Sequence, residues 1–225
     1  MDKKKIFIAM VTIIISLAIL VIVINLIFNN NSKINQGKFR VSDALLTSSA
    51  ILKEETKGEW TFDISQNNKL ALLIQSVENT KIKEIYLEKI RVNGKEDINI
   101  YIEQLNHKLS YKYEEIKNKR VNIYADEQEN GYLVELDIIN KDVVTDFTIP
   151  EDIKVVRHDG TMLNIAGVKA SEVIFRLRYN LVIFEPEGKI NKCEFDIRIP
   201  NEKVITEGTT IERLNVQDLV FKVKY

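Results

Sequence analysis

An uncharged run of 23 residues, positions 6–28, is the feature that most constrains what this chain can be. As a helix with ~1.5 Å rise per residue, the run would span roughly 34 Å, and a hydrocarbon core measures about 30 Å. The run is mostly Ile, Val and Leu, without the polar stripe of a helix that packs on a water-soluble protein. We therefore expect a transmembrane helix over residues 6–28.

A cleaved signal peptide is the alternative interpretation of this run. Its apolar region would be shorter, roughly 7–15 residues, and small side chains would follow it. Here bulky Leu26 and Phe28 stand where small side chains are needed, and no cysteine follows to support lipoprotein processing. The segment is therefore expected to stay attached as a signal-anchor.

Charges next to the run predict its orientation. Lys3, Lys4 and Lys5 precede it, and the positive-inside rule keeps such a basic tip, residues 1–5, in the cytoplasm. A polar tether over residues 29–38 would then connect the bilayer to an extracellular region that ends at residue 225. The expected location is the cell membrane, crossed once.

Composition excludes some partners of the outer region. Without residues 1–5, the chain has 29 basic and 32 acidic residues, a net charge of −3. This balance lacks the electrostatic footprint of a nucleic-acid-binding protein. Cys193 is the single cysteine, so no intrachain disulfide can form, and we expect it to be buried as a small apolar residue rather than to act as a nucleophile. A chain rich in Ile, Lys and Asn, with an anchor and no disulfide, is typical of a Gram-positive surface protein.

Period-two alternation of apolar and polar residues dominates the rest of the sequence and predicts strands. Asn67-Asn68 is expected to bound one strand, and Asn93-Gly94 is expected to turn a hairpin. Further turns are expected at Asn130-Gly131 and at residues 185–188. The expected strands cover residues 60–64, 70–74, 82–92, 98–102, 132–138, 173–184, 193–199 and 219–225.

Helical signals are few. Residues 161–166 precede Gly167 and predict one short helix with a glycine cap. Residues 43–47 fit either a helical turn or a strand edge. Residues 102–116 are ambiguous, and we favour two strands joined by a turn at 106–108.

The fold class expected from these patterns is mainly β, with one transmembrane helix and a β-sandwich region that is Ig-like or jelly-roll-like. A polar break near residues 126–131 favours two sandwich domains, 39–128 and 129–225, over one large jelly roll. Residues 81–94 are similar to a strand of jelly-roll carbohydrate-binding modules. This resemblance implies an architecture and no function.

No catalytic motif is present in the sequence. It lacks G-x-S-x-G, H-E-x-x-H and a phosphate-binding glycine loop, and both histidines, His107 and His158, are interpreted as surface turn residues. Residues 126–129 are rich in carboxylates, but a solvated turn explains them better than a calcium loop. We expect no catalytic residue, no metal ligand and no cofactor, and therefore no enzyme.

The candidate ligand-binding residues are aromatic. Trp60, Tyr86 and Tyr101, together with Tyr111 and Tyr113, could form a platform for a sugar or a partner. Aromatic residues at alternating strand positions belong more often to the core. Exposure of Trp60 is the observation that would separate the two interpretations.

Three functional classes follow, in order of preference. The first is a non-catalytic scaffold or interaction subunit of an envelope assembly, which contacts the lipid bilayer through residues 6–28 and a membrane-proximal protein partner. The second is a module that binds cell-wall glycan, and the third is an enzyme with an unrecognised site. If residues 219–225 form an edge strand, they could also accept a strand from a partner.

Overall fold

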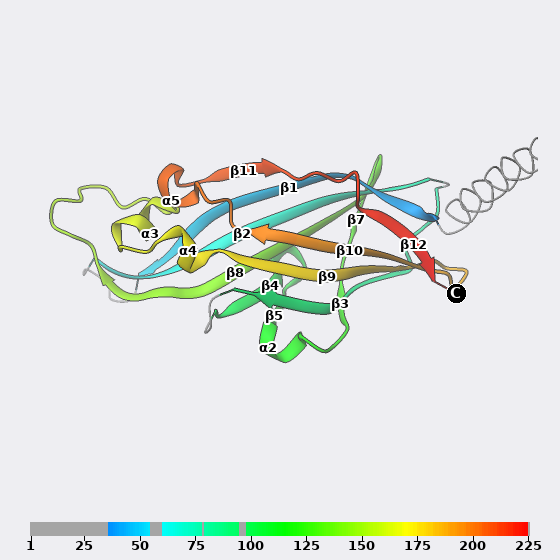
Figure 1. The fold of residues 1–225 in the computed structure, drawn as a ribbon, viewed down its shortest axis with the longest axis horizontal. Coiled ribbons are helices and arrows are strands. Elements are labelled where there is room, and N and C mark those ends of the chain that lie inside the picture. Colours follow the sequence, from blue (N-terminus) through cyan, green and yellow to red (C-terminus); the bar gives the residue numbers. More distant parts are fainter. Residues whose placement is uncertain (1–35, 55–59, 78, 95–97, 225) are drawn as a thin grey trace, which may run out of the picture. The chain divides into compact units, whose positions relative to one another are not determined.

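The structure, a computed structural model, describes residues 36–54, 60–77, 79–94 and 98–224. It is mainly β, with a nearly closed antiparallel sheet of 12 strands (Figure 1). The predicted tip 1–5, the transmembrane segment 6–28 and most of the tether 29–38 lie outside the described residues. Within the described residues, no helix is long and apolar enough to cross a membrane.

The sheet follows the order β5-β4-β8-β2-β1-β12-β10-β9-β3-β6, with β11 beside β1 and β7 beside β8. The strands are β1 (Gln36–Glu54), β2 (Thr61–Ser76), β3 (Glu84–Asn93), β4 (Ile100–Gln104), β5 (Leu109–Lys112), β6 (Val121–Ile123), β7 (Asp126–Gln128), β8 (Gly131–Thr148), β9 (Phe175–Phe184), β10 (Ile190–Ile199), β11 (Thr210–Arg213) and β12 (Val220–Lys224). The helices are α2 (Tyr113–Ile116), α3 (Thr161–Ile165), α4 (Ala170–Val173), α5 (Val204–Glu207) and the 3-10 helix η1 (Leu105–His107).

The two ends of this sheet approach each other. Strands β5 and β6 are the last strands of the path, and they follow one another in the chain through α2. The Tyr111 hydroxyl on β5 donates a hydrogen bond to the Asn122 carbonyl on β6 (3.0 Å). The Gln104 side chain on β4 also bonds to the backbone of Tyr124, just after β6. These contacts join the two ends through side chains, since no strand pairing connects β5 with β6 among the described residues.

Alternation along β2 explains why one face of the sheet forms a core. Its side chains are buried at every second position from Phe62 to Ile74, as the pleat of a strand requires. The main hydrophobic cluster combines Leu70, Leu72 and Ile74 of β2 with inward side chains of β1, β3, β8, β9 and β10. Inside it, the Tyr179 ring stacks on the Phe195 ring with centroids 4.9 Å apart.

A second, smaller hydrophobic cluster lies at the C-terminal end of β1, around Ala50 and Leu52. Figure 1 shows α3, α4 and α5 gathered there, and their apolar residues cover the ends of β1 and β2. Inward polar side chains separate this cluster from the main one: Ser48, Gln66, Asn68 and Asn140. Gln66 donates a hydrogen bond to Asn68 (3.0 Å), and Asn68 donates one to the Ile138 carbonyl (3.1 Å).

This polar layer corrects the prediction that Asn67-Asn68 bounds a strand. Strand β2 runs through both residues without a break. Asn68 is tolerated inside because its amide is bonded within the layer, and buried polar groups are stable when they are hydrogen-bonded. Residues 43–47, left open between a helical turn and a strand edge, lie within β1, between its partners β2 and β11.

The hairpin predicted at Asn93-Gly94 is also wrong. Strand β3 does end at Asn93, but β3 pairs with β6 and β9, whereas β4 pairs with β5 and β8. Glycine is required at position 94 by a close approach rather than by a turn. A Cβ atom there would lie 2.8 Å from the Phe175 Cβ atom.

Several other local predictions are confirmed. Strands β7 and β8 form a tight hairpin before Gly131, and Gly188 closes the turn between β9 and β10 with φ of 87°. Strands β4 and β5 pair around η1, as expected for residues 102–112, although residues 113–116 form α2 instead of a strand. The short helix before Gly167 is α3.

Two larger predictions concern the arrangement of the strands. The expected division into domains 39–128 and 129–225 does not correspond to a division in the structure, because residues 37–225 form one compact unit and β2 pairs with β8 along most of its length. The possibility that residues 219–225 form an edge strand is contradicted. Strand β12 lies between β1 and β10 inside the sheet.

Candidate binding groove

The three predicted aromatic residues do not form one platform. Trp60 precedes β2 and is 49% exposed, whereas Tyr86 on β3 is only 2% exposed. Tyr101 lies on β4, where the Lys141 ammonium group stands 3.8 Å from its ring centroid. Among the described residues, no ring contact joins any two of them.

Tyr86 lies instead on the outer face of β3, beside Phe184 of β9, where the Arg120 side chain forms a cover over both rings. Its ring centroid lies 4.9 Å from that of Phe184, and the Arg120 guanidinium carbon lies 4.3 Å above the Tyr86 ring. Arg120 comes from the segment between α2 and β6, so this segment folds over the outer face of the sheet. Burial under this cover raises the pKa of Tyr86.

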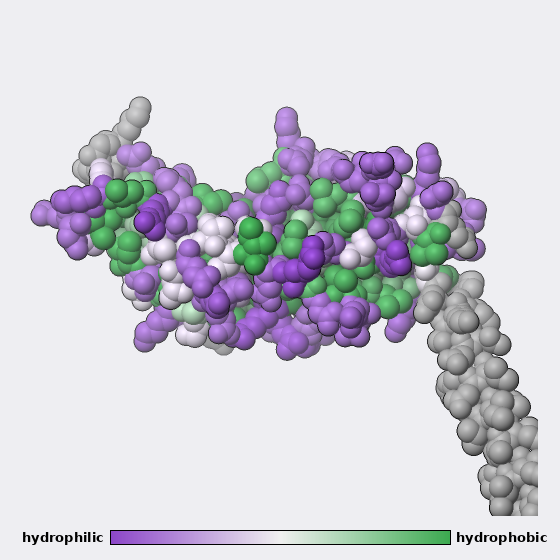
Figure 2. All heavy atoms as spheres, turned by 90° about the horizontal axis from the view of Figure 1, so that it is seen from above, coloured by the Kyte–Doolittle hydropathy of each residue, from purple (hydrophilic) through white to green (hydrophobic). Residues whose placement is uncertain are grey.

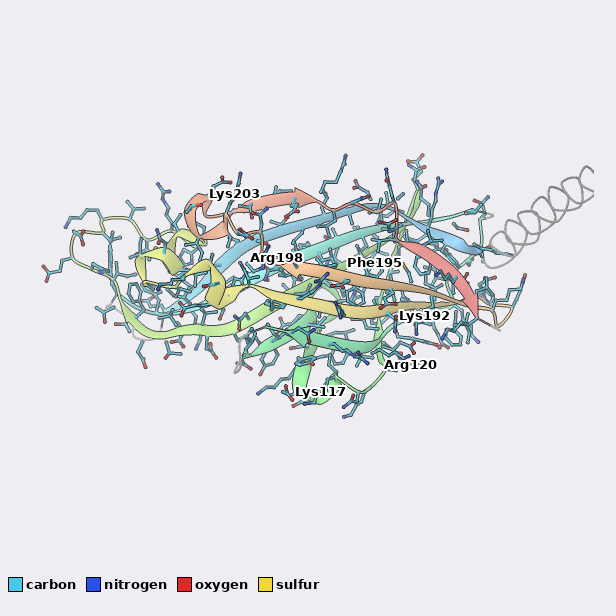
Figure 3. All side chains as sticks on the ribbon, viewed as in Figure 1. Lys117, Arg120, Lys192, Phe195, Arg198 and Lys203 are labelled. Atoms are coloured by element: carbon cyan, nitrogen blue, oxygen red, sulfur yellow. The ribbon has the colours of Figure 1, made fainter. Side chains whose placement is uncertain are left out.

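A carboxylate holds two cations beside this cover. Glu88 accepts hydrogen bonds from the Lys192 ammonium group (2.6 Å) and from Arg120 (3.3 Å). Burial acts to raise the pKa of the Glu88 carboxyl, but the bonds from Lys192 and Arg120 outweigh burial and lower the pKa. Figure 3 shows Lys192 on β10, Arg120 and Lys117 following one another along this side of the body.

A second carboxylate holds two arginines further along the same face. Asp196 on β10 accepts hydrogen bonds from Arg176 and from Arg178 (2.8 Å), which lie two residues apart on β9. Burial acts to raise the pKa of Asp196, yet the two guanidinium groups lower it overall. The arginine side chains are thereby oriented across the sheet surface.

A groove of about 510 Å³ lies on this outer face. It crosses β3, β9, β10 and β12, whose residues meet in register: Arg91 lies opposite Arg178, and Lys192 lies opposite Lys222. Six cations line it against two carboxylates, Glu194 and Asp218. The cations are Lys89, Arg91, Arg178, Lys192, Lys222 and Lys224.

Four of the six cations have no ion pair among the described residues. Lys192 and Arg178 are held by the carboxylates of Glu88 and Asp196. The exposed residues Lys89, Arg91, Lys222 and Lys224 have no such partner. The groove therefore has an excess of unneutralised positive charge on a chain whose total charge is −1.

An amide side chain lies on the groove floor. Asn180 on β9 is 6% exposed, between Glu194 on β10 and Glu88 on β3. It lines the groove, because its neighbours Tyr179 and Leu181 point into the core. Its amide makes no hydrogen bond to the other described residues, and it is not among the side-chain groups that are sealed from solvent without a partner, so it opens into the groove.

Charge of the opposite sign gathers on the part of the sheet made by β4, β7 and β8. A small pocket there is lined by Lys69, His107 and three carboxylates: Asp126, Glu135 and Asp137. Lys69 pairs with Glu135 (2.7 Å), and the His107 ring stacks on Tyr124 with centroids 4.4 Å apart. Burial raises the pKa of Asp137, although the positive charge of Lys69 acts to lower it.

The cysteine and the two histidines, which were considered as chemically active residues in the sequence, do not line the groove. Cys193 is buried as expected, and burial raises the pKa of its thiol to about 12. His158 lies in an exposed bend, as predicted, whereas His107 is half-buried, with Nε2 3.1 Å from the Asp126 Oδ1 atom. Among the described residues, no group of three or more His, Cys, Asp or Glu side chains is arranged to hold a metal ion.

Exposed apolar side chains are scattered rather than gathered into a second candidate surface. Figure 2, which looks onto β1 and β11, shows small apolar groups separated by polar ones. The exposed apolar residues of these two strands are Leu45, Ile51 and Ile211.

The groove could not be predicted from the sequence because its cations come from four strands. A local signal does exist: Arg176 and Arg178 are two residues apart, as are Lys222 and Lys224, so each pair shares one face of a strand. Which strands lie side by side could not be read from this signal.

Comparison with protein-family models, with curated proteins and with solved structures finds no match.

Proposed function

We propose that this chain is a membrane-anchored, extracytoplasmic, non-catalytic interaction protein, a scaffold subunit of a cell-envelope assembly. In this proposal residues 6–28 are a retained transmembrane helix, residues 1–5 are cytoplasmic, and the β body lies outside the membrane. The charge-free length of the apolar run and the lysines before it support this arrangement.

The observation that carries the proposal is the basic groove. It combines fixed cations, held by Glu88 and Asp196, with unpaired cations on β3 and β12. A surface with excess charge of one sign attracts and orients a partner of the opposite sign. The groove thus supports binding of an anionic partner.

The partner is expected close to the membrane. Strand β1 begins at Gln36, so at most residues 29–35 are available as a free tether. Seven residues reach about 25 Å when fully extended. The scaffold role therefore applies to membrane-proximal components of the envelope.

Site-specific photo-crosslinking in native membranes tests the proposal. A photoreactive residue placed at Arg91, on the groove, should give discrete adducts. The same residue at Lys154, which is exposed in the segment between β8 and α3, should give none. Equal adducts from both positions, or none from the groove, would contradict the proposed function.

A second candidate function, glycan binding, is favoured by one observation. Trp60 is 49% exposed, and an exposed tryptophan can stack on a sugar ring. Titration with soluble cell-wall glycan should then change Trp60 fluorescence, and Trp60→Ala should abolish glycan binding. An unchanged spectrum at saturating glycan would remove this candidate.

A further inference from the structure

The groove on β3, β9, β10 and β12 holds features that select one kind of anion. We infer that it binds a linear polyanion with a phosphate group in each repeat. The inference rests on the proposed function for the role of the groove, and it adds the chemistry of the partner. Three observations support it: the extent of the cation track, the Asn180 amide that opens into the groove, and the concave form of the site.

The cation track is too long for a single small anion. In strand register, the track begins at the level of Arg178 and Arg91 on β9 and β3. It continues to Lys192, which pairs with Val182 of β9 on one side and with Lys222 of β12 on the other. It ends at Lys224, which pairs with Ile190 of β10, the residue that lies opposite Phe184 of β9. Six residues of β9 separate its ends, which is roughly 20 Å at about 3.3 Å per residue. Several anionic groups on one chain are needed to contact all of these cations.

The side chains of the track suit phosphate oxygens. Arginine presents a planar fork that can bind two oxygens of one phosphate, and lysine binds phosphate as a compact point charge. Arg178 is already oriented by Asp196, whereas Arg91, Lys222 and Lys224 are free to adjust. The track therefore combines preorganised and adaptable cations.

Asn180 adds a neutral contact at the centre of the track. Asn180 is 6% exposed as a residue, and its amide opens into the groove without a hydrogen bond to the other described residues. An amide NH2 group donates hydrogen bonds to an oxygen acceptor, and a bound phosphate oxygen would satisfy it. The flanking carboxylate of Glu194 disfavours any anion that does not sit between the cations.

The depth of the floor favours a chain over a lipid surface. A flat layer of headgroups meets the exposed rim residues Arg91, Lys222 and Lys224, but it does not extend to a side chain buried as deeply as Asn180. A flexible polymer can enter the groove and reach the floor. Binding that depends on Asn180 therefore separates the two sources of phosphate.

The test uses the full-length protein in nanodiscs of zwitterionic lipid, with fluorescently labelled inorganic polyphosphate as the probe. The groove variant is Arg91→Gln/Lys222→Gln/Lys224→Gln. The matched control is Arg157→Gln/Lys154→Gln/Lys203→Gln, which removes one arginine and two lysines from exposed positions elsewhere. Both variants lower the net charge equally, so a difference between them reports the groove.

We expect the groove variant to bind polyphosphate at least about ten-fold more weakly, and its plot of log affinity against log salt to become shallower by about 2. The control should change by less than about two-fold, because long-range attraction by distant charges is screened by salt. Asn180→Leu should weaken binding about five-fold without changing the salt slope, since it removes a neutral hydrogen bond. Melting curves check that each variant is folded.

Several results would overturn the inference. These are equal weakening by both triple variants, equally tight binding of polyglutamate, or binding of phosphatidylglycerol vesicles in place of polyphosphate with no effect of Asn180→Leu. A groove that gives photo-crosslinks in membranes but does not bind polyphosphate would refute this inference and leave the proposed function standing. Absence of groove crosslinks would refute the proposed function itself.

Discussion

The side chain of Gln104 pairs with the backbone of Tyr124 as a neighbouring strand would. Its Nε2 atom donates to the Tyr124 carbonyl (2.9 Å), and its Oε1 atom accepts from the Tyr124 amide (2.7 Å). The same Nε2 atom also donates to the Glu135 carbonyl (3.1 Å). One buried amide thus connects β4, β8 and the segment after β6, where the sheet is nearly closed.

Replacing Gln104 by Glu should destabilise the protein by about 3 kcal/mol, because a carboxylate cannot donate to the two carbonyls and would leave them unpaired. Urea unfolding measures this change. Gln75→Glu is the control, since Gln75 is bonded only at the surface, to Arg40. Equal stability of the two variants would show that the Gln104 side chain does not hold β4 and β8 to the segment after β6.

Asp137→Asn should stabilise the protein at neutral pH. Burial raises the pKa of Asp137 above its ordinary value of 3.8, so the folded state binds this proton more tightly than the unfolded state. Stability is therefore lost as the pH rises from about 3.8 through the folded pKa. The variant should be more stable than the wild type above this range and equal to it below, as measured by urea unfolding at a series of pH values.

Asp152→Asn is the matched control for that pH series, because Asp152 is exposed. It should follow the wild-type profile. A gain for Asp137→Asn that persists unchanged down to pH 3 would show that ionisation of Asp137 is not its cause.

The Cys193 thiol should be nearly inert in the folded protein. Burial raises its pKa to about 12, and the thiolate is the reactive form. Labelling by a thiol reagent at pH 8 should be more than about 100-fold slower in buffer than in denaturing urea. Rapid labelling of the native state would instead place the thiol at an accessible site.

Phe221→Ala should destabilise the protein by about 4 kcal/mol, as expected for the loss of a fully buried aromatic ring. Phe221 packs edge-on against Phe39, with centroids 6.2 Å apart. Val220→Ala, on the exposed side of β12, should have an effect below about 0.5 kcal/mol. Both values come from urea or thermal unfolding.

Deletion of residues 219–225 should prevent folding, because β12 separates β1 from β10 within the sheet. Circular dichroism and gel filtration of the truncated chain measure this directly. A folded truncated protein would mean that β12 is dispensable, as an added edge strand would be.

Strand positions could be predicted from the sequence because alternation is a local property. Residues 132–138 and 193–199 lie in β8 and β10 as predicted, and β9 covers 175–184 of the predicted strand 173–184, whose first residue ends α4. The continuation of β2 through Asn68 could not be predicted locally, since the hydrogen-bond partner of Asn68, the Ile138 carbonyl, lies 70 positions away. Strand pairing is equally non-local, so the mainly β class could be predicted but the single sheet through residues 37–224 could not.

The candidate site was harder to predict, for a related reason. Tyr86 resembles a binding aromatic in the sequence, but its ring is covered by Arg120, which approaches from outside the strand. Lys192 and Lys222 become neighbours only through the pairing of β10 with β12. Net charge, which is close to zero, also conceals the separation of basic and acidic regions on the surface.

Protease treatment of intact native cells, followed by detection of the N-terminal fragment, shows whether residues 6–28 are retained as a membrane anchor. If they are, the β body is digested from outside, while a fragment that begins at Met1 and contains residues 6–28 remains in the membrane. A mature chain that begins near residue 30, or a body that is digested only after the cells are broken, would contradict it.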